Sequence, residues 1–526
     1  MINYTSLEGS FELIQNILGR TLPEKVFGVT VLPYQGIHAS RTRGRSRIGT
    51  RYQPYVVTRD TKRFYDDVDH LLGYHFLRLF DGMSISFHHI LREGDGVVLP
   101  IVDAFASYGI KNITLASSAL FPVHSPLLEH IETGVIGRIE GSMNGPIGRA
   151  LSKGEVTIPS ILRSHGGRAR AVQEGSLHID VAFIAASAAD FLGNLTGIEG
   201  KNAFGSIGYP LETDSLYADV VIGVTDTVLD RPLEKVSIPS SRVDAILEVD
   251  SIGDPTKIVS GSLSRKLSPS RLEIAETAVQ AMYYSGFLES GFNWQAGAGG
   301  MSLATTKYLK ELMIDKNIEG SYIFGGIAGL SVDLLEAGLF KTIYDAQSFD
   351  LRAIESLRNN PNHVEVSIDH AYNPFNKGCI ANNTDFSALG ATEVDVNFNV
   401  NVNTFSDGTL NSGIGGHQDA ARAKISMILL PLARKVPCIV DEVVTVSSPG
   451  DCIDIVVTDD GIAVNSKRKK LSKRLEDSGL NVRPINDLKD EAKSLKQPIE
   501  AKLTDNITTL VEYRDGTHLD VIYQLE

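Results

Sequence analysis

The chain has 526 residues, which is too long for one ordinary hydrophobic core and predicts two or three domains. Its contents of 42% hydrophobic and 22% charged residues are typical of a globular protein and exclude a fibrous or disordered one. The net charge of -14 argues against a general nucleic-acid binder, because phosphate binding requires a basic surface.

The cysteines and the apolar runs indicate a cytoplasmic protein. Cys379, Cys438 and Cys452 form no CxxC pair, and this sparse, odd count favours a reducing compartment over a disulfide framework. No apolar run approaches the ~18 residues that a bilayer span needs. The N-terminal sequence MINYTSLEGSFELI lacks the basic flank and apolar stretch of a signal peptide.

Residues 1–70 are expected to form a weakly organised N-terminal extension. They contain a basic stretch, ASRTRGRSRIGTRY, at 39–52. We favour a solvated surface loop for this stretch, and the alternative is an arm that binds a phosphate or an acidic partner.

Residues 71–264 are predicted to form an α/β domain. Apolar runs at 83–89, 112–118, 135–142, 156–164, 178–187, 217–226 and 243–253 are interpreted as strands. Helices are expected at about 96–108 and 125–134, and after the SHGGRARA sequence that begins at residue 164. Continuous apolar strands that alternate with helices favour a largely parallel sheet covered on both faces.

Residues 265–526 are predicted to contain a second copy of this domain. The polar sequence GSLSRKLSPS at 261–270 marks the boundary, and Pro269 is well placed to start a helix. FNWQAGAGGMSLA, GSYIFGGIAGL and DLLEAGLFKTIYDAQ then follow the order of SISFHHILREGD, NITLASSALF and LLEHIETGVIGRIEG. The tail is expected to hold strands in 426–464, surface helices in 467–479 and 487–495, and a hairpin with Asp-Gly at its turn.

The segment 384–424 combines features that open α/β sheets use for sites. An apolar run ends at Glu393, the alternating sequence VDVNFNVNVNTF predicts a strand, and GIGGHQDAARAK opens a helix. The alternative is a buried strand, a hairpin and a turn. When Asp180 is aligned with Asp385, Ala188 falls at the position of Glu393, so the carboxylate is present in one copy of the repeat only. This difference makes Glu393 a candidate functional residue, and a packing role is the alternative.

Four glycine-rich turns follow predicted strands, at 164–170, 297–300, 325–329 and 413–416. None fits a nucleotide-binding fingerprint. Glycine lets backbone amides approach a ligand, and a following helix N-terminus favours an anion, so such turns can hold a carboxylate or an oxyanion. Ordinary tight turning is the alternative at each one.

Histidines and arginines beside these turns are candidates for binding carboxylates. His88 and His89 follow the first strand with Arg92 three residues on, and no HExxH motif or Cys/His cluster supports a metal site. Arg168 and Arg170 follow Gly166-Gly167, and arginine suits bidentate carboxylate recognition. His417 lies just after Gly415-Gly416 and could polarise an acyl oxygen, whereas no GxSxG elbow supports a serine hydrolase. A satisfied core histidine or a surface charge is the alternative for each residue.

These sequences together resemble the citrate lyase alpha subunit family. The resemblance runs from about residue 81 to 485 and is carried by DGMSISFHHILREGD, RSHGGRARA, HIDVAFIAA, VDSIGDPTKIVSG, GAGGMSLA, NPNHVEVSID, NFNVNVNTFSDG, GGHQDAARAK and VTDDGIAVN. The histidine run of this family is commonly three residues long, whereas this chain has Ile90 at the third position.

The resemblance implies two tandem, internally duplicated CoA-transferase-like domains and a citrate CoA-transferase activity. The subunit would exchange acetyl for citryl on the CoA-like thiol of an acyl carrier (gamma) subunit, and a lyase (beta) subunit would cleave the citryl product. The implied cofactor is the phosphoribosyl-dephospho-CoA group of that carrier, for which acetyl-CoA is a surrogate, and no group bound to this chain is implied. A homo-oligomer within a larger complex is also expected.

The resemblance further implies roles for the candidate residues. A citrate carboxylate would attack the acetyl thioester and form a mixed anhydride, which the thiolate would then open. His88, His89, Arg92, Ser164, Arg168 and Arg170 would bind citrate. The glycine turns, with Gly297, Gly299, Gly300, Gly325, Gly326, Gly415 and Gly416, would contact the acyl groups, and Gly299 and Gly300 would act with His417 and Glu393 in catalysis. Glu393 would be either a covalent nucleophile or a base or orienting group. A CoA-transferase for another acid, such as citramalate, and a non-catalytic citrate-binding assembly subunit remain as alternatives.

Overall fold

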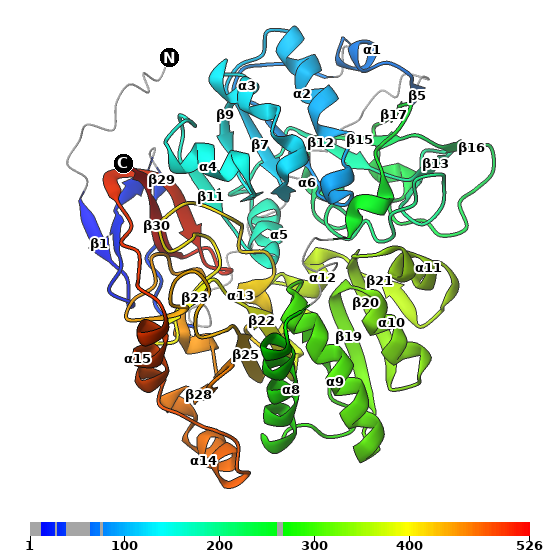
Figure 1. Cartoon of the computed structure of the whole chain (residues 1–526). Coiled ribbons are helices and arrows are strands. Elements are labelled where there is room, and N and C mark those ends of the chain that lie inside the picture. The colour runs from blue at the N-terminus through cyan, green and yellow to red at the C-terminus, as the bar shows by residue number, and fades with distance from the viewer. Residues whose placement is uncertain (1–11, 27–28, 38–63, 74–76, 260–266) are drawn as a thin grey trace.

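The computed structural model describes residues 12–26, 29–37, 64–73, 77–259 and 267–526. Its two halves lie one above the other in Figure 1, with the first half drawn in blue to green and the second in green to orange. The basic stretch at 39–52 lies outside the described residues. No helix in the described part of the chain is long and apolar enough to cross a membrane.

The first half is built on a seven-stranded sheet with the order β5-β17-β15-β12-β6-β7-β9. All of its neighbouring strands are parallel. The strands are β5 (Phe64–Tyr65), β6 (Ser84–Phe87), β7 (Ile113–Ser117), β9 (Ile136–Ile139), β12 (Val181–Ala185), β15 (Val220–Thr225) and β17 (Ala245–Glu248). The helices are α1 (Val68–Leu72), α2 (Val98–Ser107), α3 (Leu127–Glu132), α4 (Pro146–Ser152), α5 (His165–Glu174) and α6 (Asp214–Tyr217).

The second half is built on an eight-stranded sheet with the order β21-β20-β19-β18-β22-β25-β27-β28, parallel except for the final β27–β28 pair. The strands are β18 (Trp294–Ala296), β19 (Gly320–Ile327), β20 (Phe340–Ser348), β21 (His363–Glu365), β22 (Phe386–Gly390), β25 (Ile425–Leu429), β27 (Ile455–Thr458) and β28 (Gly461–Val464). The helices are α8 (Pro269–Tyr284), α9 (Gly300–Lys316), α10 (Gly329–Glu336), α11 (Leu351–Asn359), α12 (Ile368–Tyr372), α13 (His417–Ala420), α14 (Lys469–Asp477) and α15 (Ile485–Leu495).

Smaller sheets and short 3-10 segments complete the fold. The sheets are formed by β1 (Leu13–Gln15) with β2 (Thr21–Pro23), β3 (Lys25–Val26) with β4 (Val29–Thr30), and β8 (Ala119–Leu120) with β10 (Ser142–Met143). Three-stranded sheets are formed by β13 (Ala188–Asp190), β14 (Leu195–Thr196) and β16 (Val228–Leu229), by β23 (Glu393–Asp395), β24 (Val400–Asn401) and β26 (Ile439–Val440), and by β11 (Ser160–Leu162), β29 (Leu503–Glu512) and β30 (His518–Leu525). The 3-10 segments are η2 (Arg92–Gly94), η3 (Pro122–His124), η4 (Ser240–Arg242), η5 (Pro255–Ile258), η6 (Ile380–Asn383), η7 (Gly450–Cys452) and η8 (Ser466–Arg468).

The predicted internal repeat is present in the strand order. Read from β9, the first sheet runs β9-β7-β6-β12-β15-β17, and the second runs β20-β19-β18-β22-β25-β27 in the same sequence order. The aligned aspartates play the same part: the carboxylate of Asp180 accepts from the Ser84 amide at 2.7 Å, and that of Asp385 from the Asn293 amide at 3.1 Å. The strands that begin with Ala188 and Glu393 also pair alike, each with one antiparallel and one parallel neighbour.

The alternating stretch at 394–405 forms the hairpin of the alternative interpretation, and not the single strand that its period-2 pattern predicts. β23 and β24 pair antiparallel on either side of a tight turn. The carboxylate of Asp395 accepts from the amides of Asn397 and Asn399 at 2.8 and 2.9 Å, and Phe398 adopts a φ of 65°. Asp and Asn side chains favour such turns, and this local chemistry overrides the period-2 pattern.

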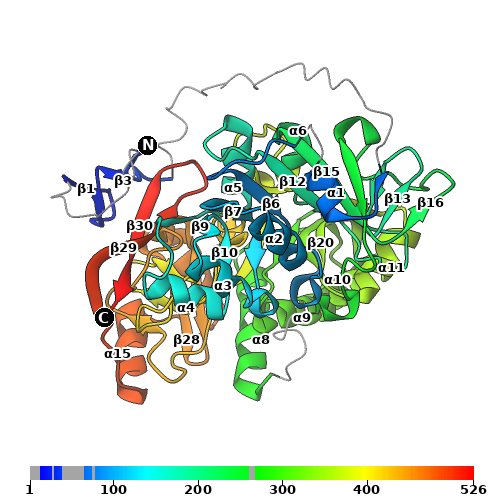
Figure 2. The same cartoon turned by 90° about the horizontal axis from the view of Figure 1, so that it is seen from above.

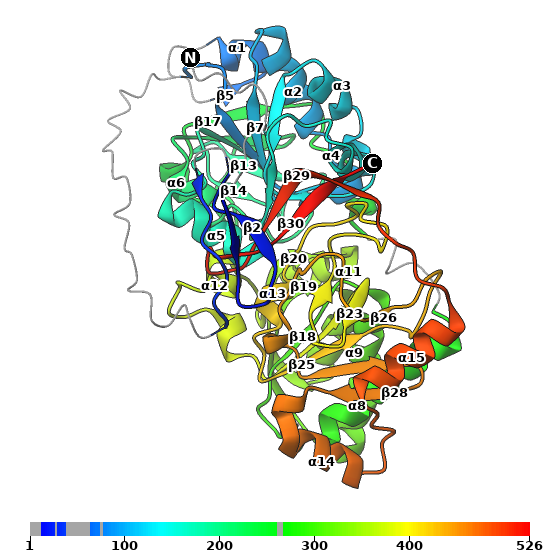
Figure 3. The ribbon, with the colours of Figure 1, turned by 90° about the vertical axis from the view of Figure 1, so that its left-hand side faces the viewer.

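The two ends of the chain pack together, which the sequence did not predict. The C-terminal hairpin β29–β30 extends from the second half and adds β29 in parallel to β11 of the first half. The N-terminal strands lie against this hairpin, as Figures 2 and 3 both show. Asn16 donates to the carbonyl of Leu519 at 2.6 Å, and Arg20 pairs with the buried Asp520 at 2.5 Å. Residues 12–37 are therefore more organised than we expected, apart from the two that the structure does not describe.

A cavity at the facing ends of the two sheets

A cavity of about 590 Å³ lies where the carboxyl ends of the strands of both sheets meet. Ligands of open parallel sheets bind at this edge, because the loops that follow the strands converge there. The first half contributes residues that follow β6 and β7, and the second half contributes residues in or just after the carboxyl ends of β18, β19, β20 and β22. The lining includes His89, Arg92, Phe121, Asn144, His165, Tyr209, Gln295, Gly297, Ala298, Gly299, Gly325, Gly326, Gln347, Phe349, Tyr372, Gly390, Thr392, Asn411, Gly415, Gly416 and His417.

Arg92 brings a positive charge into the cavity and forms no ion pair with a described carboxylate, although its neighbour Glu93 partly offsets the charge from a greater distance. Its guanidinium lies between the rings of Phe121, from the first half, and Phe349, from the second, at 5.1 and 5.3 Å from their centres. Within the described ranges it makes no side-chain hydrogen bond or ion pair, and no aspartate or glutamate lines the cavity. Burial lowers the pKa of Arg92, so the folded protein bears a cost for this charge. An anionic ligand would remove that cost.

His89 and His165 face the cavity as neutral imidazoles. Burial holds the pKa of His89 well below its usual value, and nearby positive groups add to the shift. Burial and the charge of Arg168 lower the pKa of His165 to about 3. His89 Nδ1 lies 2.6 Å from the hydroxyl of Ser118, and His165 Nε2 lies 2.5 Å from that of Tyr209. Each ring is therefore held by a hydroxyl group and kept uncharged at neutral pH.

His417 completes this set of imidazoles from the second half. Its Nδ1 lies 2.8 Å from the Ser448 hydroxyl, and burial lowers its pKa to about 4. Nearby, the amide of Gln295 donates to the Tyr372 hydroxyl at 2.5 Å. The Tyr372 hydroxyl proton is thereby left for another acceptor. Neutral hydrogen-bonding groups, together with one cation, thus make up the polar part of the lining.

The glycine turns reach the cavity for different reasons. Gly325 has a φ of 106°, and a Cβ there would come within 2.5 Å of the Tyr372 hydroxyl, while a Cβ on Gly326 would come within 2.0 Å of the Phe349 ring. Packing therefore requires glycine at both positions. Gly415 has a φ of 60°, and its carbonyl accepts from the His165 amide at 2.9 Å.

The turn before α9 is different. Gly299 has an ordinary φ of -77°, and only the Ser302 hydroxyl, 3.8 Å away, would contact a Cβ at that position. The amide of Gly297 is already bonded to the Ala388 carbonyl at 2.8 Å, so it is not free to serve as a ligand donor. Gly300 follows as the first residue of α9 and is not itself part of the lining.

The predicted residues His88, Ser164, Arg168 and Arg170 lie behind the cavity rather than in its lining. Arg168 forms a bidentate pair with the buried Asp214 at 2.8 and 2.9 Å, and His88 lies 3.4 Å from the same carboxylate. The remaining two have internal partners as well. Arg170 pairs with Glu512 and Glu174, and Ser164 caps α5 by accepting from the Gly167 amide at 3.0 Å. Internal carboxylates thus neutralise both arginines.

Glu393 is also outside the lining, although its neighbour Thr392 belongs to it. The carboxylate is 1% exposed and accepts from the Asn401 side chain, the Ser406 hydroxyl and the Val444 amide at 3.0, 2.7 and 3.0 Å. It lines a separate cavity of about 280 Å³. These three donors tie the loops at 401, 406 and 444 together.

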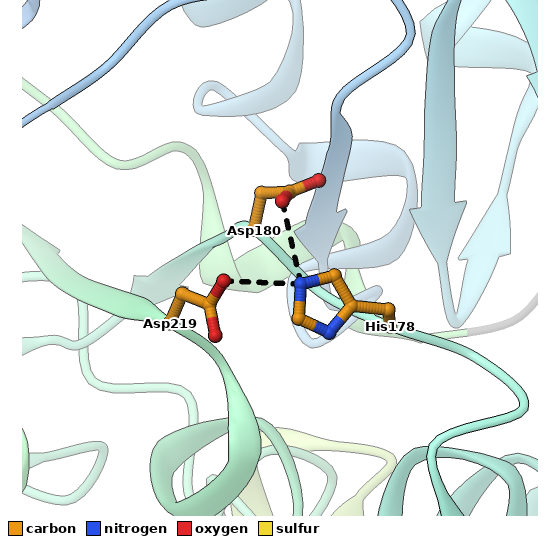
Figure 4. A group of neighbouring side chains, drawn as sticks. All are labelled: His178, Asp180 and Asp219. Atoms are coloured by element: carbon orange, nitrogen blue, oxygen red, sulfur yellow. Dashed lines mark hydrogen bonds and ion pairs between the residues drawn. The ribbon is translucent and has the colours of Figure 1, made fainter. Parts of the chain in front are cut away.

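One further group of side chains has the composition of a metal site. His178 Nε2 lies 3.3 Å from Asp180 and 3.0 Å from Asp219, as Figure 4 shows. These residues precede β12 and β15, so they lie at the amino ends of the strands, away from the cavity. Asp180 is engaged by the Ser84 amide, and its hydrogen bond raises the pKa of His178. A protonated histidine shared by two carboxylates accounts for the cluster without a metal.

The structure brings together nine of the predicted residues: His89, Arg92, Gly297, Gly299, Gly325, Gly326, Gly415, Gly416 and His417. It adds others that the sequence reasoning missed, above all His165, Tyr209, Gln295 and Tyr372. His165 lies in the SHGGRAR sequence, next to its glycines, and this position could have identified it as a candidate site residue. Tyr209 lies outside the four glycine-rich turns that the sequence analysis singled out, and reaches the cavity only through the fold.

Comparisons with known proteins agree with this architecture. The family described as "Citrate lyase, alpha subunit (CitF)" matches residues 73–525. The citrate lyase alpha chains of Escherichia coli (strain K12) and Klebsiella pneumoniae are each 43% identical over 454 residues, which is 85% of this chain and 88% or 89% of theirs.

Solved structures extend the likeness to the fold. A Streptococcus mutans protein assigned as the alpha subunit of citrate lyase, solved in complex with citrate, superposes with a TM-score of 0.88 at 39% identity over 97% of this chain and 100% of its own. A Pseudomonas malonate decarboxylase hetero-tetramer, solved with malonate, has a chain that shares the fold at a TM-score of 0.62 and 15% identity, over 83% and 87% of the two chains. From the family match and the identity of these relatives, the chain belongs to the citrate lyase alpha subunit family.

Proposed function

We propose that this protein is a citrate CoA-transferase, which exchanges acetyl for citryl on a CoA-like thiol. The observation that carries the proposal is the cavity itself: it holds an unneutralised arginine and, within the described ranges, no carboxylate of its own. Such a lining accepts an acid substrate and supplies no carboxylate nucleophile. The citrate complex of the Streptococcus mutans relative supports the choice of acid.

The reaction then proceeds through a mixed anhydride made by the substrates alone. A citrate carboxylate oxygen attacks the acetyl thioester carbon, the C–S bond breaks, and the thiolate leaves. The thiolate next attacks the citryl carbonyl of the anhydride, and acetate departs with the bridging oxygen. No proton or electron is needed from outside, and both tetrahedral oxyanions can be stabilised by neutral donors in a poorly hydrated site.

The residues of the lining fit these steps. Arg92 would bind a citrate carboxylate, and the neutral His89, His165 and His417 would donate hydrogen bonds without carrying a charge that holds the anions too tightly. Tyr209 would fix the ring of His165. Glu393, which is sealed from the cavity by its three donors, would hold the loop that carries Thr392.

The physiological thioester in this proposal is the phosphoribosyl-dephospho-CoA group of an acyl carrier subunit, and a lyase subunit consumes the citryl product. The cavity volume of about 590 Å³ leaves room for a thioester head beside citrate. Assembly as a homo-oligomer within a cytoplasmic complex belongs to the same proposal.

An oxygen-labelling experiment tests the mechanism. The protein is mixed with acetyl-CoA and citrate labelled with ¹⁸O in its carboxylates, and products are analysed after a single turnover. The proposal expects citryl-CoA and acetate that carries one ¹⁸O atom from citrate. Label in the protein and unlabelled acetate would instead require an enzyme carboxylate, and citrate binding without turnover would leave an assembly role.

A further inference from the structure

The N-cap residue of α9, Gly299, lines the same cavity as Arg92, and no side chain in the described part of the chain caps this helix. α9 has 17 residues, Gly299 precedes it without a side-chain cap, and its first turn contains no acidic residue. The amides of Gly300, Met301 and Ser302 make no hydrogen bond to any described residue. Three amides without a partner and the helix dipole make this end attractive to an anion.

Two other helices that begin near the cavity, α5 and α10, have their first amides satisfied by the protein's own side chains. At the start of α5, Asp419 accepts from the Gly166 amide and Ser164 from the Gly167 amide, both at 3.0 Å. At the start of α10, Asp350 accepts from the Gly329 amide at 2.7 Å. The chain thus supplies a carboxylate at both of these helix ends and leaves the end of α9 without one.

A second observation concerns Ser302, in the first turn of α9. The residue is 1% exposed and its hydroxyl has no hydrogen-bond partner within the described part of the chain. The hydroxyl lies 3.8 Å from the position that a Cβ on Gly299 would take, so it is directed at the turn. A buried hydroxyl without a partner costs free energy, and an acceptor at the turn would satisfy it.

A third observation is the glycine itself. Gly299 has a φ of -77°, which any residue adopts, and a Cβ there would meet only the Ser302 hydroxyl at an ordinary contact distance. The fold therefore does not require glycine at this position, unlike Gly325 and Gly326. An occupant that must approach the backbone closely accounts for the missing side chain.

We propose that the α9 N-terminus binds a second, non-reacting carboxylate of the acid substrate, opposite Arg92. This inference rests on the proposed function and adds a subsite to it. Citrate carries three carboxylates, whereas the cavity has one cation, so one carboxylate reacts, one pairs with Arg92 and one lies on the amides of α9 with the Ser302 hydroxyl. The two anchors select acids with more than one carboxylate over acetate.

The test measures the Kd of citrate calorimetrically for the full chain and for two variants. Gly299→Ala fills the turn, and we expect Kd to rise about 10-fold or more, because hydrogen bonds to a charged group are lost. Ser302→Ala removes one donor, and a rise of about 3- to 10-fold is expected. Thermal unfolding without citrate should show an unchanged or raised Tm for both, since neither change creates a clash or an unsatisfied group.

Matched controls separate this subsite from general damage to the helix. Thr306→Val removes another buried, unpartnered hydroxyl one turn further along α9, and Gly378→Ala adds a methyl group at an exposed glycine outside the cavity. Both should leave the Kd of citrate unchanged.

Three results would overturn the proposals, each in a distinct way. If the unmodified protein does not bind citrate, the proposed function itself fails. If citrate binds and Gly299→Ala leaves its Kd unchanged, only the α9 subsite fails. A variant that keeps the Kd of citrate but raises the KM of acetyl-CoA would assign this helix end to the thioester arm and contradict the carboxylate assignment.

Discussion

The charge of Arg92 offers the sharpest test of the site, because it should matter for binding and hardly at all for folding. In the free protein the guanidinium is half-buried between two aromatic rings and forms no ion pair with a described residue. Arg92→Gln removes a buried charge, which favours folding, and two cation–π contacts worth about 0.5–1 kcal/mol each, which opposes it. We therefore expect Tm to change by no more than about 2 °C without citrate.

Binding should respond much more strongly to the same change. Loss of charge-assisted hydrogen bonds to a carboxylate is expected to cost about 2–3 kcal/mol, or about 30- to 160-fold in the Kd of citrate. At a citrate concentration of 100 times the original Kd, the stabilisation of the folded protein should fall from about 2.7 to below about 0.9 kcal/mol. Isothermal calorimetry and thermal unfolding with and without citrate measure both quantities.

The control is Arg231→Gln, which removes an exposed arginine that pairs with Glu199 at 2.8 Å outside the cavity. This variant should bind citrate like the unmodified protein. A rise of less than about threefold in Kd for Arg92→Gln would refute the assignment of Arg92 to a substrate carboxylate, because even one such hydrogen bond contributes about 1.5 kcal/mol.

Three further predictions address other residues. Glu393→Gln should keep acyl transfer within about threefold of the unmodified rate, since the amide oxygen can still accept hydrogen bonds and the side chain lies outside the cavity; a loss of more than about 100-fold in kcat would restore the covalent role. Tyr209→Phe should lower kcat by about 10-fold with little change in the Kd of citrate, because it frees the ring of His165; an equal rise in Kd would show a binding role instead. The pKa of His417 is about 4 in the folded protein, below the value of about 6.5 in the unfolded chain. The stability that its neutral ring contributes is therefore complete above pH 6.5 and is lost as the pH falls toward 4. Urea unfolding at pH 7 and pH 5 should show that the free energy of unfolding falls by about 2 kcal/mol less in His417→Gln than in the unmodified protein. An equal fall in both proteins would contradict the neutral state of the ring.

The sequence predicted the sheets well because the relevant signals are local. β12, β15 and β22 are short apolar runs, buried along their length, and such runs identify strands of a covered parallel sheet. The alignment of Asp180 with Asp385 also identified two equivalent residues, because each carboxylate accepts a hydrogen bond from a backbone amide at or just before the start of the neighbouring strand. The period-2 pattern failed to predict the turn at 394–401, because the Asp395 side chain accepts hydrogen bonds from nearby backbone amides and closes a hairpin there.

The site was harder to predict, because burial and pairing decide which charged residues face a ligand. Arg92, Arg168 and Arg170 look alike in the sequence, and all three stand beside a turn that follows a strand. Asp214 pairs with Arg168 and Glu512 pairs with Arg170, so neither arginine is left to bind a ligand. These carboxylates are 46 and 342 residues away along the chain. Nothing local in the sequence distinguishes the arginine that lacks such a partner.

The asymmetry of the repeat also acquires a different meaning. Glu393 lacks a counterpart in the first half, and this difference suggested a catalytic group. In the structure its carboxylate fastens three loops of the second half, including the one that leads through Asn411 to His417 along the cavity wall. Where the protein needs a carboxylate for its own architecture, at Asp214, Glu512, Asp419 and Glu393, it seals that group among internal donors. The groups left unneutralised at the cavity, Arg92 and the start of α9, are both electropositive. In the proposed mechanism, a site arranged in this way would hold the anions of its substrates and add none of its own, so that a carboxylate of one substrate could attack the thioester of the other directly.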